Sequence, residues 1–324
     1  MQDLISKIFS PSKGILALDW STKTITEKFA AVGLTSTPDL NRKYRQMLLT
    51  TPGIENYISG VIFFEETAKQ SLDNGLSFPA FLESKGVIPG IKVDKGAEKF
   101  NDVEEATLGL DDLDKRLKEF SPMGLKFTKW RSLFKITDIY PSKEFLEENL
   151  NRLVSYAKIS IENNFVPILE PEVSMKGNHT TTRCGEITEQ VLLLMFEKLK
   201  KEDIDLKNII LKTNMILPGQ DGIVRASALE VAEATLRILR RSVPPEVKGV
   251  VFLSGGQDAE TVTLNLNEIA KRKSDPWDLS FSFARALQSE ALATWAGKDE
   301  NVSAAQQVFL SRLEKVGKAR QGQL

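Results

Sequence analysis

The sequence predicts a single domain, residues 1–324, with the α/β architecture of a (β/α)8 barrel, or TIM barrel. Short apolar runs recur eight times along the chain, and in most cases an amphipathic stretch with helical spacing follows. No linker or low-complexity segment interrupts this alternation, which is typical of a parallel sheet closed into a barrel. An open doubly wound sheet is the alternative, but no Gly-x-Gly-x-x-Gly follows an early strand.

The apolar runs are short, and turn-forming or charged residues bound them. We expect strands at residues 14–19, 58–64, 88–94, 125–131, 165–170, 208–215, 249–254 and 279–283. Helical spacing predicts helices near residues 23–33, 39–50, 110–120, 145–157, 183–201, 226–242, 285–295 and 301–316. The residues from about 317 onward are polar and basic, and we expect this short tail to fray.

Composition excludes several classes of function. The formal net charge of −1 disfavours a surface that binds nucleic acid. A single cysteine, Cys184, excludes an internal disulfide, and a single histidine, His179, weakens a zinc hypothesis. The N-terminus lacks a signal-peptide pattern, and no apolar run reaches membrane-spanning length. We therefore expect a cytoplasmic protein that binds neither nucleic acid nor a membrane.

One apolar run leads directly into a lysine. Residues 209–211 are Ile-Ile-Leu, Lys212 comes next, and Pro218 and Gly219 follow soon after. A short β-branched run of this kind predicts a buried strand. Burial disfavours the ammonium form of a lysine, and a neutral lysine amine can attack a carbonyl carbon to form a Schiff base. The alternative is that Lys212 lies just past the strand with its ammonium group in water.

Polar residues lie at the ends of the expected strands, where barrel enzymes have their active sites. They are Asp19, Lys92, Lys129, Arg131, Glu170, Glu172, Lys212, Ser254 and Arg285. Acids beside a buried lysine suit imine chemistry. A carboxyl with a raised pKa can protonate a carbinolamine hydroxyl, and another carboxylate can take a proton from a substrate hydroxyl. The remaining cations, and the backbone N–H groups of the glycines after Ser254, suit phosphate.

Each of these residues also has a structural explanation. Asp19 could cap the following helix, the glutamates could balance nearby lysines, the other lysines could form a solvated face, and the Ser-Gly-Gly segment could be a plain turn. Trp130 and Cys184 are expected in the core, and His179 in a loop. Together these structural explanations are less convincing than each is alone. All of them would have to hold at the same place, the end of the strand, in successive strand–helix repeats.

Longer runs of residues show a resemblance to a known family. They are residues 44–46, 51–53, 57–62, 64–67, 90–96, 129–131, 166–172, 211–212, 240–245, 252–257, 280–288 and 295–298. In this order they are similar to class I fructose-bisphosphate aldolase, the metal-independent type that acts through a Schiff base. The resemblance extends from about Ile8 to about Leu313 and rests on many long runs rather than on one short motif.

The resemblance implies a role for each matched position. Lys212 would be the Schiff-base lysine, and Glu170 the acid and base that forms and dehydrates the carbinolamine. Asp19 would be a carboxylate near the cleaved bond with Lys129 beside it, and Glu172 a partner in the same charge network. The C1 phosphate of the ketose would bind Ser254, Gly255, Gly256 and Arg285, and the far phosphate would bind Ser21, Thr24, Lys92 and Arg131.

The implied reaction is the reversible cleavage of fructose 1,6-bisphosphate to dihydroxyacetone phosphate and glyceraldehyde 3-phosphate, in glycolysis and gluconeogenesis. The resemblance further implies that no metal or other cofactor is required and that the protein is a homotetramer.

The sequence also departs from the family. Trp20 stands where the family usually has an acid, Lys23 where it has glycine, Thr213 where it has proline, and Ala284 where it has glycine. The tail whose terminal tyrosine assists proton transfer in animal members has no counterpart up to residue 324. Because Trp20 and Lys23 adjoin the far phosphate site, they bear on rate and substrate preference more than on imine chemistry. The alternatives are a Schiff-base aldolase that acts on a different phosphosugar and, from another class, a non-catalytic scaffold.

Overall fold

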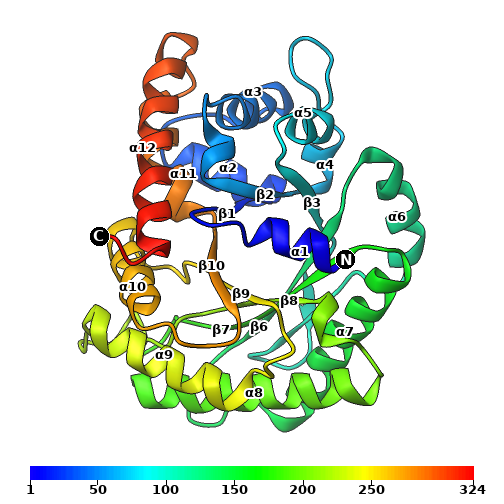
Figure 1. Cartoon of the computed structure of the whole chain (residues 1–324), viewed down its shortest axis with the longest axis vertical. Coiled ribbons are helices and arrows are strands. Elements are labelled where there is room, and N and C mark those ends of the chain that lie inside the picture. Colours follow the sequence, from blue (N-terminus) through cyan, green and yellow to red (C-terminus); the bar gives the residue numbers. More distant parts are fainter.

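The computed structural model describes all 324 residues, and eight parallel strands close into a barrel (Figure 1). The strands are β1 (Gly14–Leu18), β2 (Ile58–Phe63), β3 (Ile88–Lys92), β6 (Phe127–Phe134), β7 (Val166–Val173), β8 (Ile210–Thr213), β9 (Gly249–Phe252) and β10 (Asp278–Phe283). Their order around the barrel is β1-β10-β9-β8-β7-β6-β3-β2, and β2 pairs with β1 to close the ring. The prediction of a (β/α)8 barrel is therefore confirmed, and the open doubly wound sheet is excluded.

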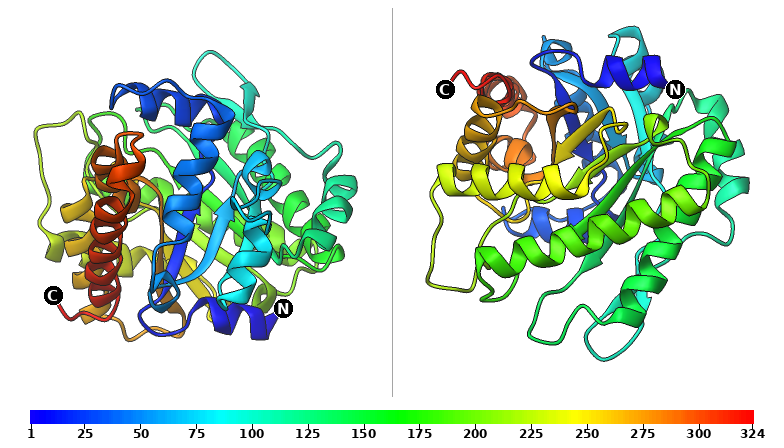
Figure 2. Two further views of the ribbon diagram at one scale, coloured as in Figure 1. Left: turned by 90° about the horizontal axis from the view of Figure 1, so that it is seen from above. Right: turned by 60° about the horizontal axis from the view of Figure 1, so that its bottom comes forward.

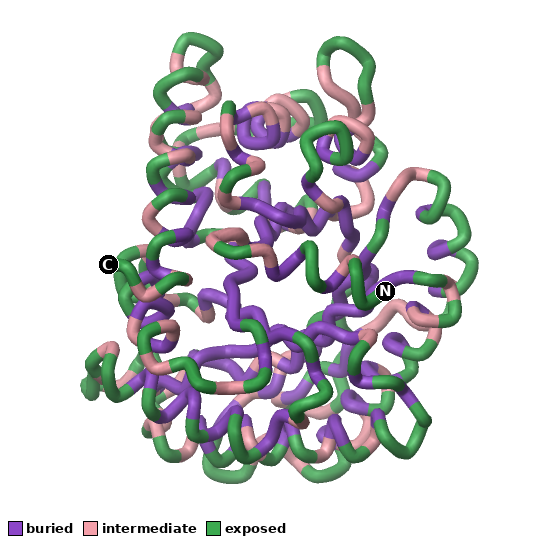
Figure 3. Tube along the Cα trace, in the orientation of Figure 1, coloured by how far each residue is buried: buried purple, intermediate pink, exposed green.

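Helices surround the barrel, so that buried strands lie inside a ring of partly exposed helices (Figure 3). They include α2 (Thr22–Ala30), α3 (Pro38–Leu49), α4 (Glu65–Ala68), α5 (Phe78–Ser84), α6 (Leu113–Phe120), α7 (Lys143–Glu162), α8 (Thr181–Lys201), α9 (Ala228–Ser242), α10 (Ala259–Lys271), α11 (Arg285–Trp295) and α12 (Val302–Arg320). The larger apolar core fills the space between these helices and the strands. None of the helices combines the length and apolarity needed to cross a membrane.

A smaller core fills the inside of the barrel near the starts of the strands. Alternate residues of each strand point inward. The inward apolar residues include Ile15, Ile62, Phe127, Val166, Ile168, Ile210 and Val251. Helix α1 (Gln2–Ile8) lies across this end of the barrel, and its Ile5 and Ile8 join the same core (Figures 1 and 2). The opposite end, at the carboxyl ends of the strands, is left open for polar side chains.

A short antiparallel hairpin, β4 (Ala97–Lys99) and β5 (Glu105–Thr107), lies between β3 and α6 in the chain. The sequence analysis did not predict it, because a strand of three residues is too short for alternation to reveal. Thr107 Oγ1 donates a hydrogen bond of 3.0 Å to the carbonyl oxygen of Arg131, which joins the hairpin to β6. The hairpin thereby becomes one wall of the space above the barrel.

The C-terminal segment differs from the expectation that the chain frays from about residue 317. Helix α12 continues through Gly317 to Arg320. The guanidinium of Arg320 donates to three backbone carbonyl oxygens in the segment that precedes β1. Leu324 N–H donates to Asn267 Oδ1 at 3.0 Å. These contacts are with distant parts of the chain, so the polar composition of the tail could not reveal them.

Two glycines leave room for an aromatic ring inside the barrel. A Cβ atom on Gly90 would overlap the ring of Phe127, and one on Gly60 would approach it within 3.2 Å. Phe127 is itself fully buried. The side chain that one strand lacks is therefore replaced by a large one from a nearby strand, which keeps the interior at normal packing density.

We predict that Gly90→Ala lowers the free energy of unfolding by about 1–3 kcal/mol, the usual cost of overpacking a filled core. The measurement is the midpoint of urea-induced unfolding. Gly185→Ala is the control, because a Cβ there would approach Ile238 and Ile216 no closer than an ordinary 3.4 Å inside helix α8. That substitution should raise stability by up to about 1 kcal/mol. Adding Phe127→Leu to Gly90→Ala should recover part of the loss, and no recovery would show that the ring is not the obstacle.

Candidate active site

Every site residue predicted from the sequence lines one cleft of about 560 Å³ at the carboxyl ends of the strands. These residues are Asp19, Ser21, Thr24, Lys92, Lys129, Arg131, Glu170, Glu172, Lys212, Ser254, Gly255, Gly256 and Arg285. They come from most of the barrel strands or from the loops that follow them, so barrel closure brings them together. The structure therefore places the whole predicted set in one cleft.

Strands β6 and β7 supply the charged floor of the cleft. Each has eight residues, and their paired register places Arg131 opposite Glu170. Alternation along each strand brings Lys129 and Arg131 to one face of β6, and Glu170 and Glu172 to the same face of β7. The first inward residues of these strands are apolar and the later ones are charged, so polarity changes along the barrel axis.

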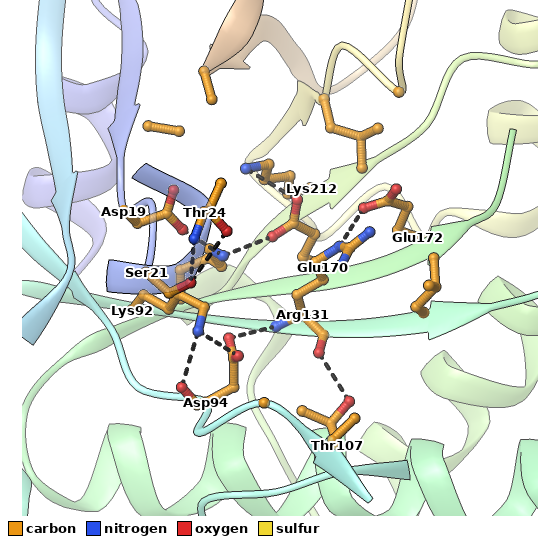
Figure 4. Close-up of a pocket in the computed structure, with 18 of the residues that line it drawn as sticks. Asp19, Ser21, Thr24, Lys92, Asp94, Thr107, Arg131, Glu170, Glu172 and Lys212 are labelled. Atoms are coloured by element: carbon orange, nitrogen blue, oxygen red, sulfur yellow. Dashed lines mark hydrogen bonds and ion pairs between the residues drawn. The ribbon is translucent and has the colours of Figure 1, made fainter. Parts of the chain in front are cut away.

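Two buried lysines share one buried carboxylate in the floor. Glu170 Oε1 lies 3.0 Å from Lys212 Nζ, and Glu170 Oε2 lies 3.2 Å from Lys129 Nζ. Lys129 Nζ also lies 2.6 Å from Asp19 Oδ2, so the four side chains alternate in charge. Figure 4 shows the carboxylate of Glu170 beside Lys212. Lys212 belongs to β8 and is only 4% exposed. The alternative that its ammonium group extends into water is therefore wrong.

These contacts change the pKa values of the acids. Burial alone would raise the pKa of Asp19, but the nearby ammonium groups of Lys129, Lys212 and Lys92 outweigh it and lower the pKa to about 2. Burial likewise acts to raise the pKa of Glu170, but Lys129, Lys212 and Arg131 lower it overall. The sequence analysis expected a carboxyl with a raised pKa. Neither of these two acids has one, because each lies beside more than one cation.

Lys129 responds in the opposite direction. Burial acts to lower its pKa, but Asp19, Glu170 and Asp94 outweigh burial and raise it. Lys129 is 3% exposed, so the alternative of a solvated lysine face is wrong at this position. It stays protonated and holds the two carboxylates in place.

One end of the cleft offers hydrogen-bond donors that have no partner in the protein. The loop after β9 is Ser254-Gly255-Gly256, and both glycines have positive φ angles, 57° and 85°. Their backbone N–H groups donate to no protein acceptor. Arg285, the first residue of α11, forms no ion pair and has its Nη2 3.6 Å from the Cβ position of Gly256. Free N–H groups beside a free guanidinium are suited to an anion.

At the other end of the cleft the cations are already paired. Lys92 Nζ lies 2.7 Å from Asp94 Oδ1, and Arg131 Nε lies 2.5 Å from Glu172 Oε2. Ser21 caps helix α2, and its Oγ lies 3.1 Å from Thr24 Oγ1. The alternative that Asp19 caps this helix is wrong, because Ser21 does so.

Asp94 and Ser282 are two of the polar cleft residues that the sequence analysis did not predict. Asp94 lies two residues after Lys92, so both point to the same side of an extended segment, and that spacing was the available signal. Ser282 lies on β10 between Phe281 and Phe283, which face the outer core. Its buried hydroxyl has no hydrogen-bond partner and lines the cleft.

Residues expected to be structural occupy structural positions. Trp130 is fully buried and stacks on Tyr156, and Cys184 is buried in α8. His179 lies in the loop between β7 and α8. Trp20 is buried except for a small part that lines the cleft, and it stacks on Tyr44 with ring centroids 6.3 Å apart.

We predict that Lys129→Met lowers the free energy of unfolding at pH 7 by about 3–5 kcal/mol, because it leaves two buried carboxylates without their shared cation. In the folded wild type the pKa of Asp19 is about 2, below its ordinary value of 3.8, so its ionised form stabilises the fold above pH 3.8. In the variant, burial is no longer outweighed by Lys129, and protonation of the acids favours the folded state. The stability difference should therefore shrink between pH 7 and pH 5.

The measurement is urea unfolding at both pH values, with Lys135→Met as the control. Lys135 also lines the cleft, but its ion pair with Glu105 at 3.2 Å is largely exposed. Its removal should cost less than about 1 kcal/mol, with little dependence on pH. Equal losses in the two variants would contradict the role assigned to Lys129.

Comparison with known proteins identifies relatives over nearly the whole chain. The model of the family "Fructose-bisphosphate aldolase class-I" matches residues 1–324. Fructose-bisphosphate aldolase 1 of Toxoplasma gondii is 43% identical over 320 residues, which are 98% of this chain and 88% of the relative. Cytosolic fructose-bisphosphate aldolase 5 of Arabidopsis thaliana is 46% identical over 310 residues, or 94% of this chain and 86% of the relative.

A solved structure shows the same similarity. Fructose-bisphosphate aldolase from Plasmodium falciparum, in complex with TRAP and a small-molecule inhibitor, superposes with a TM-score of 0.97 and 40% sequence identity. The match covers 99% of this chain and 94% of that one. The family model, the relatives and the shared fold agree, and the chain belongs to the class I fructose-bisphosphate aldolase family.

Proposed function

We propose that this protein cleaves fructose 1,6-bisphosphate reversibly to dihydroxyacetone phosphate and glyceraldehyde 3-phosphate, through a Schiff base on Lys212, in glycolysis and gluconeogenesis. The observation that supports it most is the position of Lys212, buried 3.0 Å from Glu170 at the centre of the cleft. A carboxylate at hydrogen-bond distance can exchange a proton with the amine, which is what imine formation requires.

Imine formation begins with proton transfer from the Lys212 ammonium group to Glu170. The neutral amine attacks the C2 carbonyl of the ketose to give a carbinolamine, and the protonated carboxyl of Glu170 returns its proton to the leaving hydroxyl, so that water departs. The lowered pKa of Glu170 fits the first half of this cycle, because the carboxylate is ionised before substrate binds. Lys129 keeps the carboxylate oriented at 3.2 Å throughout.

Bond cleavage follows from the positive charge on the iminium carbon. A carboxylate takes the proton of the C4 hydroxyl, the C3–C4 bond breaks, and its electron pair moves into the iminium to form an enamine. We assign this proton transfer to Asp19, which lies 2.6 Å from Lys129, and Glu172 belongs to the same charge network through Arg131. Protonation of the enamine at C3 and hydrolysis then release the ketose product. The iminium is itself the electron sink, so the mechanism requires no metal.

The two ends of the cleft fit the two phosphates. We assign the C1 phosphate to the end with free donors, formed by Ser254, Gly255, Gly256 and Arg285, and add the unpartnered hydroxyl of Ser282. The far phosphate is assigned to Ser21, Thr24, Lys92 and Arg131. A sugar bound with its two phosphates at these ends would have its reacting carbons near Lys212 and Glu170, which line the same cleft.

Assembly and location are further parts of the proposal. We infer a single-domain protomer in a homotetramer, as the family resemblance implies, and light scattering on the purified protein measures the mass directly. A cytoplasmic location is supported by the cytosolic aldolases of Arabidopsis thaliana among the relatives.

We predict that dihydroxyacetone phosphate, followed by sodium borohydride in the presence of EDTA, leaves a stable adduct on Lys212, mapped by mass spectrometry. Borohydride reduces the imine to a secondary amine, so only the Schiff-base lysine is labelled. Lys212→Met should remove the label and cleavage together. A folded wild type without an adduct would favour the scaffold, and an adduct on Lys92 or Lys129 would place the chemistry on another strand.

We predict that Asp19→Asn and Glu170→Gln separate the two halves of the mechanism. Glu170→Gln should slow adduct formation at Lys212 by roughly 10²-fold or more, because proton exchange with the amine is lost. Asp19→Asn should slow cleavage by a similar order while the adduct still forms with dihydroxyacetone phosphate. Rapid-quench labelling and steady-state cleavage measure the two steps, and equal effects of both variants on both steps would contradict the assigned roles.

A further inference from the structure

The two ends of the cleft differ in how their cations are held. Arg285 at one end has no ion-pair partner in the protein, whereas Lys92 at the other end contacts a carboxylate closely. Lys92 and Asp94 have side chains only 16% and 6% exposed, so this is not a surface pair. A nearly buried carboxylate beside a cation that is to bind phosphate needs a physical reason.

Asp94 holds Lys92 at more than one point. The Nζ atom of Lys92 lies 2.7 Å from Asp94 Oδ1 and donates to the backbone carbonyl oxygen of Asp94 at 3.0 Å. On another side it lies 5.8 Å from the ring centroid of Phe64, within the range of a cation–π contact. Lysine has a flexible four-carbon stem, so fixing its ammonium group in one place requires several such contacts. One of its three N–H groups remains for a ligand.

Asp94 also extends the hydrogen bonding between the β3 segment and β6 beyond the last backbone–backbone bond. Strand β3 ends at Lys92, and the bond from Val93 N–H to the carbonyl oxygen of Lys129, 3.0 Å, is the last backbone bond of that ladder. Two residues farther along β6, the N–H of Arg131 donates to Asp94 Oδ2 at 3.3 Å (Figure 4). The carboxylate thus takes the place of a backbone carbonyl and fixes the segment that follows β3 against β6.

From these contacts we propose that Asp94 is a positioning residue for the far-end phosphate: it holds Lys92, through Oδ1 and its own carbonyl oxygen, at a fixed distance from Arg131. The inference rests on the proposed function and deepens it by naming what sets the preference for a bisphosphate over a 1-phosphate. Asp94 does not touch the substrate. It acts through Lys92, and each of its two carboxylate oxygens has a separate task.

An asparagine cannot replace Asp94. The amide side chain would have one acceptor oxygen, and its nitrogen would point a donor at either the ammonium of Lys92 or the N–H of Arg131. Asp94→Asn should therefore raise KM for fructose 1,6-bisphosphate by about tenfold or more, the order expected when a charge-assisted hydrogen bond is lost. KM for fructose 1-phosphate, which lacks the far phosphate, should rise much less, and kcat for the bisphosphate should change less than KM.

A double-mutant cycle tests whether Asp94 acts through Lys92. The variants are Asp94→Asn, Lys92→Met and the pair together, each assayed on both substrates. Once Lys92 is gone, Asp94→Asn should add less than about a twofold change in KM for the bisphosphate. Asp102→Asn is the control, because Asp102 also pairs with a lysine, Lys99 at 2.7 Å, in the same connection but outside the cleft. It should change neither KM.

Three results would overturn the inference. The first is a fall in KM for the bisphosphate in Asp94→Asn, which would show that the carboxylate opposes phosphate binding. The second is a similar rise in KM for both substrates in this variant. The third is that the effects of Asp94→Asn and Lys92→Met on KM are fully additive in the double-mutant cycle. If Asp94→Asn fails to fold, Phe64→Leu removes a different contact of Lys92 and should raise the bisphosphate KM selectively. Borohydride trapping of wild type is run alongside: its failure removes the proposed function, whereas success without a selective KM change removes only the role of Asp94.

Discussion

The carboxylate of Glu170, shared between the ammonium groups of Lys129 and Lys212, is the interaction on which the rest of the cleft depends. All three side chains are nearly excluded from water, so each charge is stabilised by its neighbours rather than by solvent. Asp19 completes the set through Lys129. This alternation keeps both acids ionised, and it leaves Lys212 beside a group that can accept its proton. Burial and neighbouring charge act in opposite directions on these pKa values, and in Asp19 and Glu170 the charge has the larger effect.

The barrel allows this concentration of charge because its interior changes character along its axis. Near the strand starts, Phe127 and the surrounding aliphatic residues form a dry core that α1 covers. Two residues farther along β6, the inward position is Lys129, and β7 changes in the same way from Ile168 to Glu170. The apolar layer therefore supports the charged layer from below. Loss of packing in the first layer would be transmitted to the second, because both belong to the same strands.

The two ends of the cleft are suited to anion binding in different ways. The loop after β9 presents backbone N–H groups on glycines with positive φ and a guanidinium without a partner, so its donors are free before a ligand arrives. The far end instead has cations that are neutralised and oriented by Asp94 and Glu172. Free donors favour strong attachment, whereas paired cations limit the positive potential and fix its position. Trp20, which stacks on Tyr44, adds an uncharged side chain to the lining of the cleft between Asp19 and Ser21.

The sequence by itself determined the eight strands, most of the long helices, and the polar residues at the strand ends, including Lys212, because periodicity and turn residues are local signals. It did not predict the short helices α4 and α5 or helix α10, which the structure places between β2 and β3 and between β9 and β10. Together with the family resemblance, it also named 13 of the 27 residues that line the cleft. Only the tertiary structure decided which acid pairs with which lysine, the lowered pKa values of Asp19 and Glu170, and the parts played by Asp94 and Ser282. It likewise decided that α12 continues to Arg320. These features depend on strand order and register around a closed barrel, which bring together residues far apart in the chain and have no local signature.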